Sequence, residues 1–328
     1  MRKPVISITM GDPAGIGPEI VVKALKSPEI LKNCAPVIFG SYAIISQMAK
    51  KYAKNLKIEK IESLDKIKKS KINFFDCAST NPKQIKIGKI NLASAKMAID
   101  SVVSCVDACL DKKIDAMVTA PLSKKGLQLA GYNYPGHTEF LADYTKAQSY
   151  AMMFVADQLK VVLVTTHLPL KEVSRRISLK LILEKIKLAD TSLKSLFKIR
   201  KPKIGVCALN PHAGENGIFG DEESKIIIPA INSARKNKIE VFGPFPSDSI
   251  FSPEISGKFD CVLAMYHDQG LIPLKLSGIG NSVNLTLGLP FVRTSPDHGT
   301  ALDIAGKGMA NPNGMVSAIE LAIALSRI

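Results

Sequence analysis

Tryptophan is absent from this 328-residue sequence, and aromatic residues make up only 6% of it. Arginine is also scarce: only 7 of the 44 basic residues are arginines, so lysines carry most of the positive charge behind the net +15. Nucleic-acid-binding proteins tend to use arginine forks and aromatic platforms. We therefore interpret the charge as a solvated lysine surface that attracts an anionic substrate, and we expect no nucleic-acid partner. A nucleic-acid-binding protein is the alternative from another class, and it predicts strongly salt-dependent binding.

Long hydrophobic runs are missing as well. No apolar stretch approaches the ~18–20 residues that span a bilayer, so we expect no membrane association. Gly11, Asp12 and Pro13 interrupt the apolar N-terminal stretch before it reaches the length of a signal-peptide core. The six cysteines include no C-x-x-C pair and lie singly in apolar segments, which is typical of reduced thiols. These features predict a cytoplasmic protein.

Short apolar runs alternate with segments of helical periodicity along most of the chain. We expect buried strands at Val5–Met10, Pro36–Phe39, Ile72–Phe75, Ala116–Thr119, Ala151–Val155, Val161–Thr165, Ile204–Leu209 and Cys261–Tyr266. We expect helices at Pro18–Leu25, Leu92–Leu110, Leu179–Phe197 and Glu222–Arg235, and a peripheral strand or helix within Asn55–Lys71. This alternation predicts an α/β fold with a largely parallel sheet.

Histidine is rare, and three of the five histidines directly follow predicted strands. These are His167, His212 and His267. The carboxyl ends of strands form the functional crevice of open α/β sheets, and three neutral imidazoles suit zinc or a similar divalent ion. Ordinary loop histidines remain the alternative, because the three lie far apart in the sequence. Asp268 either orients the imidazole of His267 or caps a helix that begins at Gln269.

A glycine-rich turn follows the first predicted strand. Gly11, Gly15 and Gly17 do not have the G-x-G-x-x-G spacing of a Rossmann nucleotide site. The turn leads into a helix that begins near Pro18, and free amides at a helix N-terminus can bind an anion. A ligand-binding turn and a purely structural turn are both consistent with this pattern.

Seven motifs follow one another from the first strand to the last quarter of the chain. They are Gly11–Glu19, Thr119–Lys124, Gly136–Glu139, Thr166–Pro169, Asn210–Glu215, Tyr266–Pro273 and Asp297–Ala301. Together they resemble the 4-hydroxythreonine-4-phosphate dehydrogenases of vitamin B6 synthesis, and the resemblance covers essentially the whole chain.

The resemblance implies a fold similar to that of isocitrate and isopropylmalate dehydrogenases. Such a fold has two α/β/α domains, a non-Rossmann cofactor site and an active-site cleft between the domains. We expect a discontinuous cofactor-side domain at residues 1–130 plus 285–328 and a second domain at 131–284 that holds the metal ligands and the dimer interface. The segment Leu276–Asn281 is an alternative crossing between the domains.

The resemblance also implies roles for individual residues. It places substrate contacts at His137, Thr138, Lys275, Asn284 and Arg293, and metal ligands at His167, His212 and His267. It places the cofactor near Gly11, Asp12, Gly15, Gly17, His298 and Asp303. A carboxylate at the position of Asp303 would bind a ribose hydroxyl and repel the additional phosphate of NADP. Lys275 and Asp248 are candidate general bases, with a metal-bound hydroxide as a third possibility. Without the resemblance, Lys275 and Arg293 would be interpreted as surface cations and Asp248 equally well as a turn residue.

The implied reaction is the NAD-dependent, or NADP-dependent, oxidation of 4-phosphohydroxy-L-threonine. One divalent Zn, Mg or Co ion per site acts as the Lewis acid. The product, 2-amino-3-oxo-4-phosphooxybutanoate, decarboxylates to 3-amino-2-oxopropyl phosphate. The family further implies a homodimer whose active site is shared between subunits. Related enzymes that oxidise a 4-phospho-sugar acid (threonate or erythronate) or an aromatic dihydrodiol are the alternatives within the superfamily.

Overall fold

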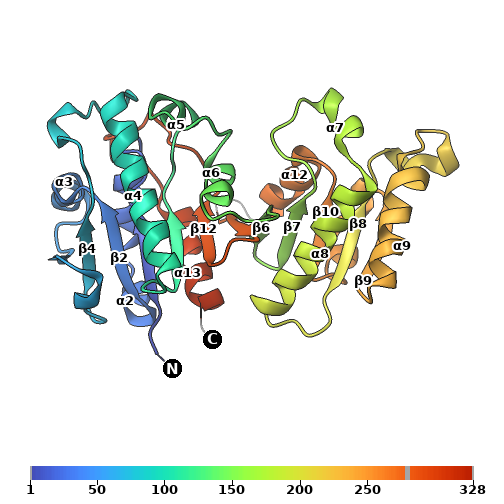
Figure 1. Ribbon diagram of the computed structural model, residues 1–328, viewed down its shortest axis with the longest axis horizontal. Helices are drawn as coiled ribbons and strands as arrows, with labels where there is room; N and C mark the ends of the chain where they lie inside the picture. The colour runs from blue at the N-terminus through green and yellow to red at the C-terminus, as the bar shows by residue number, and fades with distance from the viewer. Residues whose placement is uncertain (1, 278–280, 327–328) are drawn as a thin grey trace. The chain divides into compact units, whose positions relative to one another are not determined.

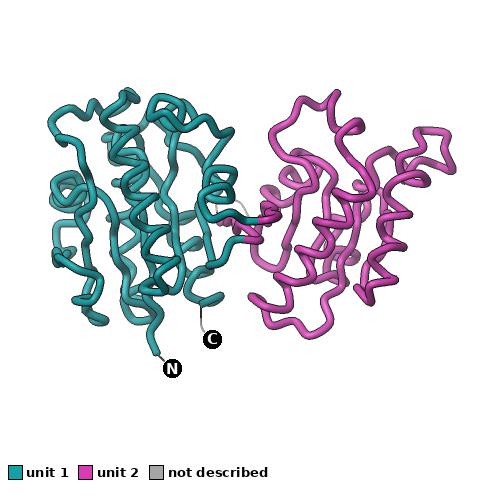
Figure 2. The backbone as a smooth tube through the Cα atoms, in the orientation of Figure 1, with its two compact units in different colours: residues 1–147, 289–328 teal, residues 148–288 magenta. Residues whose placement is uncertain are grey.

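The computed structural model describes residues 2–277 and 281–326 of the chain. It divides into two compact units, residues 1–147 with 289–328 (unit 1) and residues 148–288 (unit 2), shown in Figure 2. The domain boundaries expected from the sequence stay a prediction, because a compact unit is not by itself an independently folding domain. Part of the alternative crossing at Leu276–Asn281, residues 278–280, lies outside the described residues.

Unit 1 contains a parallel sheet. Its strands lie in the order β3-β4-β2-β1-β5-β12, and every neighbouring pair is parallel. Their bounds are β1 Val5–Thr9, β2 Ala35–Gly40, β3 Ile58–Ile61, β4 Ile72–Asp76, β5 Ala116–Thr119 and β12 Val292–Pro296. The peripheral element expected within Asn55–Lys71 is therefore confirmed as β3, the outer strand of this order.

Helices cover both faces of this sheet (Figure 1). They are α1 Gly17–Ala24, α2 Pro28–Asn33, α3 Tyr42–Tyr52, α4 Leu92–Leu110, α5 Lys124–Leu129, α6 His137–Tyr144 and α13 Asn313–Ser326, with short turns η1 Leu64–Lys66 and η2 Pro82–Gln84. Val37 and Phe39 belong to the core cluster that includes α4, and Ile38 between them is also fully buried. Because successive strand residues face opposite sides, both faces of β2 are covered.

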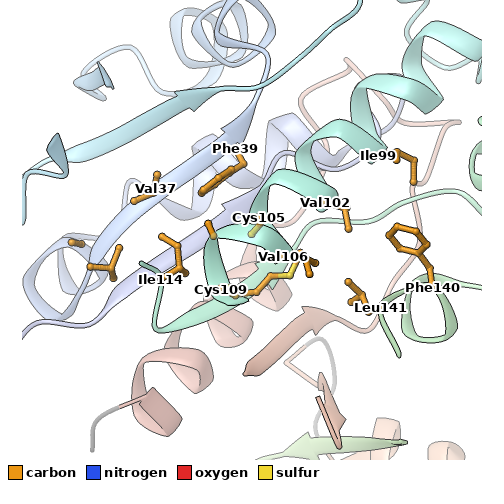
Figure 3. Close-up of a cluster of buried hydrophobic side chains, with 14 of the residues drawn as sticks. Val37, Phe39, Ile99, Val102, Cys105, Val106, Cys109, Ile114, Phe140 and Leu141 are labelled. Carbon is orange, nitrogen blue, oxygen red and sulfur yellow. The ribbon is translucent and has the colours of Figure 1, made fainter. Parts of the chain in front are cut away.

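The core of unit 1 also fixes the start of α6. Figure 3 shows Val102 and Val106 of α4 near Phe140 and Leu141 of α6, and all four belong to one buried cluster. Helix α4 begins at a reciprocal cap in which the Asn91 side chain and Ser94 bond each other's backbone amides. The buried apolar face of α6 anchors this short helix, whose first residue is the candidate site residue His137.

Unit 2 contains a mixed sheet in the order β11-β6-β7-β10-β8-β9. The β11–β6 and β6–β7 pairs are antiparallel, and the remaining pairs are parallel. The strands are β6 Ala151–Ala156, β7 Leu159–Leu163, β8 Lys203–Cys207, β9 Glu240–Phe245, β10 Cys261–Ala264 and β11 Val283–Leu287. The helices are α7 Leu170–Arg176, α8 Leu179–Ser195, α9 Ile228–Lys236, α10 Ser247–Ile250, α11 Pro253–Ser256 and α12 His267–Ser277, with η3 Pro211–Gly217 and η4 Glu223–Ile227.

The expected α/β class with largely parallel strands is confirmed. Helix α4 has the predicted bounds at both ends. The helix expected at Glu222–Arg235 instead begins with a π-helical turn, η4, that continues as α9. Over residues 2–277 and 281–326, no helix is both long enough and apolar enough to cross a bilayer.

Candidate functional site

The three candidate metal-binding histidines follow three neighbouring parallel strands of unit 2. His167 follows β7, His267 follows β10 and His212 follows β8, and β10 pairs with both of the other strands (Figure 1). The rings of His167 and His267 lie 6.0 Å apart between centroids. The parallel register thus brings these two imidazoles to the same edge of the sheet, as the strand-end pattern predicts.

Asp268 lies beside the imidazole of His267. Its Oδ1 is 2.7 Å from His267 Nδ1. A carboxylate at this position favours the tautomer with the proton on Nδ1, which leaves the Nε2 lone pair for a ligand. Helix α12 begins at His267 and not at Gln269, so the helix-cap alternative for Asp268 is wrong.

His212 lies in a left-handed turn that the sequence analysis did not foresee. The φ angles of residues 212–216 run from 42° to 79°, and Gly214 is the only glycine among them. Glu223, a buried residue at the start of η4, accepts hydrogen bonds from the backbone amides of Leu209 and Asn210, both at 2.8 Å. Its other oxygen accepts from the Asn210 side chain at 2.9 Å. The chain that leads into the turn is therefore held by one buried carboxylate.

A cavity of about 350 Å³ lies beside this turn. Its lining includes His212, Asp248, Tyr266 and Gln269. Asp248 is exposed within the short helix α10, so the geometry is consistent with a site carboxylate. Within the described ranges, no group of three or more His, Cys, Asp or Glu side chains is arranged to hold a metal ion. The three-histidine metal site therefore stays a prediction.

The candidate substrate residues of unit 1 form a second cluster. His137 and Thr138 are the first residues of α6, after the Gly136 N-cap. Arg293 on β12 is only 2% exposed, and its Nη2 donates to Thr119 Oγ1 at 2.6 Å. The interpretation of Arg293 as an ordinary surface cation is therefore wrong. Strand β12 buries its guanidinium within the unit, where the fixed fork of donors suits an anionic group.

Electrostatics couple the members of this cluster. Burial holds the pKa of His137 well below its usual value, and the positive charge of Arg293 lowers it further. Burial lowers the pKa of Arg293 to about 10, against the opposing effect of the Glu139 carboxylate. His137 is therefore a neutral imidazole near pH 7. Among the residues described, no hydrogen-bond partner contacts His137 Nε2 or the buried Thr138 Oγ1.

Two further candidate substrate residues belong to unit 2. Asn284 on β11 is buried, and its Oδ1 has no hydrogen-bond partner within residues 2–277 and 281–326. Lys275 is exposed on α12. Their contact with substrate stays a prediction.

The glycine-rich turn has a structural explanation for each of its three candidate glycines. A Cβ on Gly11 would lie 2.6 Å from Pro121 O, and Gly11 also has a φ of 71°. A Cβ on Gly15 would lie 2.6 Å from Thr300 O, and one on Gly17 would lie 2.5 Å from Met10 O. These glycines allow backbone segments to approach closely, so the structural alternative accounts for them without a ligand.

Asp12, between these glycines, is fully buried. Burial raises the pKa of its carboxyl, and a hydrogen bond from the Ala14 amide opposes the rise. Because Oδ1 bonds the amide two residues ahead, Asp12 stabilises the turn directly. Its expected contact with the cofactor stays a prediction.

The loop at residues 298–312 carries the exposed candidates His298 and Asp303. Unit 1 holds its second half by contacts that the sequence did not indicate. Lys23 Nζ donates to Glu19 Oε1 at 2.7 Å and to Ala310 O at 2.9 Å, and Glu19 Oε1 also accepts from Ala310 N at 3.1 Å. No sequence motif indicates these hydrogen bonds, because α1 and the loop lie almost 300 residues apart in sequence.

Comparison with known proteins identifies relatives over the whole chain. The family model described as pyridoxal phosphate biosynthetic protein PdxA matches residues 32–322. A D-threonate 4-phosphate dehydrogenase from Salmonella typhimurium is 44% identical and covers 99% of this chain and 100% of the relative. A 4-hydroxythreonine-4-phosphate dehydrogenase from Desulforapulum autotrophicum is 42% identical, over 98% of this chain and 95% of the relative.

Two solved structures are also similar to this chain. A 4-hydroxythreonine-4-phosphate dehydrogenase from Klebsiella pneumoniae has a TM-score of 0.89 at 39% identity, covering 99% of this chain and 100% of that one. A β-decarboxylating dehydrogenase from Thermococcus kodakarensis has a TM-score of 0.51 at 14% identity, over 96% of this chain and 81% of that one. The second likeness, at 14% identity, concerns the fold alone.

Proposed function

Because the chain belongs to the family of the pyridoxal phosphate biosynthetic protein PdxA, we propose that it is a metal-dependent dehydrogenase that oxidises 4-phosphohydroxy-L-threonine with NAD. Bound NAD would supply the hydride acceptor for the secondary alcohol, and Lys275 or Asp248 would accept its proton. The resulting β-keto acid, 2-amino-3-oxo-4-phosphooxybutanoate, loses CO₂ to give 3-amino-2-oxopropyl phosphate.

The pair of rings at the ends of β7 and β10 is the observation that carries the metal-dependent part of this proposal. His167 and His267 are 6.0 Å apart, and Asp268 is placed to hold His267 in a ligating tautomer. With His212 the donor set is three imidazoles, which fits Zn²⁺ or Co²⁺ better than Mg²⁺, because Mg²⁺ prefers oxygen ligands. When bound, such an ion supplies Lewis-acid stabilisation of the substrate's alcohol oxygen.

The cluster around Arg293 supports an anionic substrate. Its guanidinium is held against Thr119 and offers further donors to phosphate or carboxylate oxygens. His137 Nε2 and Thr138 Oγ1 are polar atoms that a bound ligand would satisfy, and leaving such atoms buried without a partner is costly. We assign these three residues to substrate binding, together with Asn284 and Lys275.

The proposal assigns the cofactor to the loop at 298–312. Asp303 is exposed there and presents a carboxylate suited to a ribose hydroxyl, which favours NAD over NADP because a 2′-phosphate would be repelled. Lys275 and Asp248 are the proposed proton acceptors. Comparing the rates with NAD and NADP before and after Asp303→Asn tests the first assignment, since the substitution should reduce the preference for NAD.

A homodimer is part of the proposal. Ile272 and Leu276 on α12 are 59% and 73% exposed and flank Lys275, as expected for a helix that a second subunit covers. Leu276→Glu should shift the chain toward monomer in light scattering, whereas Leu110→Glu, at the exposed end of α4, should not. A monomer in both the unaltered protein and the variant would contradict the dimer.

A cytoplasmic location completes the proposal. All six cysteines are free thiols in the structure. Burial raises the pKa of Cys77 to about 11 and that of Cys105 well above its usual value, so neither forms a reactive thiolate near neutral pH. Reduced, protected thiols are consistent with a reducing compartment, and cell fractionation tests the assignment.

The decisive experiment combines metal analysis with NADH formation on the purified protein. We expect 4-phosphohydroxy-L-threonine to be oxidised only when Zn²⁺ or Co²⁺ is present, and His212→Ala to lose both bound metal and activity. The matched control is His298→Ala, which removes an imidazole from the loop at residues 298–312 and should leave metal content unchanged. Full activity of His212→Ala with metal retained would refute the metal assignment.

A second candidate substrate is D-threonate 4-phosphate, because a relative at 44% identity is named for it. It differs from the first substrate in having a hydroxyl where the other has an amino group. Turnover of threonate or erythronate 4-phosphate without turnover of the amino acid would establish this alternative. Turnover of an aromatic dihydrodiol would instead show that the substrate does not need a phosphate group.

A further inference from the structure

Gln269 is a buried polar side chain whose contacts reach three separate segments of unit 2. It is the third residue of α12 and is 8% exposed. Its Oε1 accepts from Met265 N at 2.5 Å, and its Nε2 donates to Ala208 O at 2.6 Å and to Ser247 Oγ at 2.7 Å. The amide orientation is fixed, since a backbone N–H requires an acceptor and a carbonyl requires a donor.

Each of these contacts lies within a few residues of a candidate site residue. Met265 directly follows β10 and stands two residues before His267, and Ala208 directly follows β8 and stands four residues before His212. Ser247 opens α10, next to Asp248, and lines the same 350 Å³ cavity as Gln269. The side-chain amide of Gln269 therefore hydrogen-bonds to three chain segments, which carry His267, His212 and Asp248.

Thr165 links the segment that carries the third histidine, His167, to Met265. Its backbone N and its Oγ1 both donate to Met265 O, at 3.1 Å and 2.7 Å. Thr165 stands two residues before His167 and is 5% exposed. The Met265 carbonyl thus accepts hydrogen bonds from Thr165, and the Met265 amide donates one to Gln269. Together with the bond from Gln269 to Ala208, these contacts link the ends of β7, β10 and β8 in one buried network.

We propose that Gln269 is a positioning residue that holds the chain segments carrying His212 and His267, acting through Ala208 and Met265. This inference rests on the proposed function, because it requires the histidines to share a metal ion. Ligands must be held within about 0.5 Å of productive geometry, and only a buried, fully bonded group supplies that rigidity at loop ends. Loss of groups that orient metal ligands typically weakens metal affinity roughly 10- to 100-fold.

Glutamate is the sharpest substitution at this position. Gln269→Glu keeps the side-chain shape and the acceptor for Met265 N, but it places a carboxylate oxygen against Ala208 O in place of a donor. The matched control is Gln158→Glu, which introduces the same charge at an exposed position between β6 and β7 of the same unit. Any effect of added negative charge alone appears in both variants.

The experiment measures Co²⁺ affinity by calorimetry and the visible absorption spectrum of bound Co²⁺, without substrate or cofactor. We expect Gln269→Glu to weaken Co²⁺ binding roughly 10- to 100-fold and to alter the spectrum, which reports ligand geometry. Gln158→Glu should match the unaltered protein. If Gln269→Glu binds Co²⁺ with unchanged affinity and an unchanged spectrum, the inference is overturned while the metal site stands. If the unaltered protein does not bind Co²⁺, the proposed function fails first.

Thr165 keeps the inference testable if Gln269→Glu does not fold. Thr165→Val preserves the volume and removes the hydroxyl that bonds Met265 O, whereas Thr165→Ser keeps the hydroxyl. We expect weaker Co²⁺ binding and an altered spectrum in Thr165→Val, and near-normal behaviour in Thr165→Ser. Equal Co²⁺ binding in the two variants would show that the network does not position the histidines.

Discussion

The left-handed turn that carries His212 should depend on the buried carboxylate of Glu223. Four residues of this turn other than Gly214 have φ angles between 42° and 55°. Glu223 is 3% exposed and accepts hydrogen bonds from the amides of Leu209 and Asn210. Glu223→Ala removes the one oxygen, Oε1, that accepts from both amides, so the chain that enters the turn loses two hydrogen bonds.

The magnitude follows from the contacts. A left-handed conformation costs about 1–2 kcal/mol per non-glycine residue, so the turn stores roughly 4–8 kcal/mol. Hydrogen bonds to a charged group contribute about 1.5–3 kcal/mol each. Losing the two backbone bonds therefore lowers the free energy of local opening by at least about 3 kcal/mol, which is roughly a 100-fold increase in the open population.

Hydrogen–deuterium exchange measures this opening directly. In Glu223→Ala, the peptide that contains residues 209–219 should exchange about 100-fold faster, while a peptide from β7 serves as the internal reference. Glu222→Ala is the control, because Glu222 accepts from the Asn210 side chain, at 2.7 Å, and not from the two backbone amides that Glu223 holds. Equal exchange of the turn in Glu223→Ala and the unaltered protein would show that the carboxylate does not restrain it.

Two further predictions concern unit 1. Gly15→Ala should lower the free energy of unfolding by about 1–3 kcal/mol and raise KM for NAD, because its Cβ would lie 2.6 Å from Thr300 O. Gly299→Ala, which meets nothing within 4 Å, should change neither quantity in urea unfolding or steady-state assays. Because the folded-state pKa of His137 lies well below 6.5, the unfolded chain binds a proton that the folded chain does not, so stability should fall as pH drops below about 6.5. His137→Gln should reduce this slope, and identical slopes in the two proteins would contradict the assignment.

The architecture was largely predictable because hydrophobic patterns determine which segments are buried. The 19-residue helix α4 was predicted with both ends correct, since its apolar face is continuous and Asn91 supplies a strong N-terminal signal. Strands β11 and β12 were missed. Polar residues such as Asn284 and Arg293 interrupt their apolar pattern, although both side chains are buried. A buried polar residue thus obscures the apolar pattern of the strand that carries it.

The candidate site was predictable only to the level of its strand ends. The positions of His167, His212 and His267 followed from where apolar runs stop, and the order of β7, β10 and β8 makes those ends neighbours. The left-handed turn and the bonds of Gln269 depend on contacts between segments distant in sequence, and no local pattern encodes them. Resemblance to a family supplied residue roles that spacing alone could not give.

The hydrogen bonds of Lys23 to α1 and to the loop at residues 298–312 have a consequence for chemical modification of this lysine. Lys23 Nζ donates to Glu19 Oε1, Gly308 O and Ala310 O, so all three of its N–H groups are engaged. Acetylation there would remove the charge and most of these donors, while the hydrogen bond from Ala310 N to Glu19 Oε1 would remain. The ammonium group of Lys23 is therefore part of the structural framework of unit 1, and neutralising it would be expected to weaken the attachment of this loop to α1.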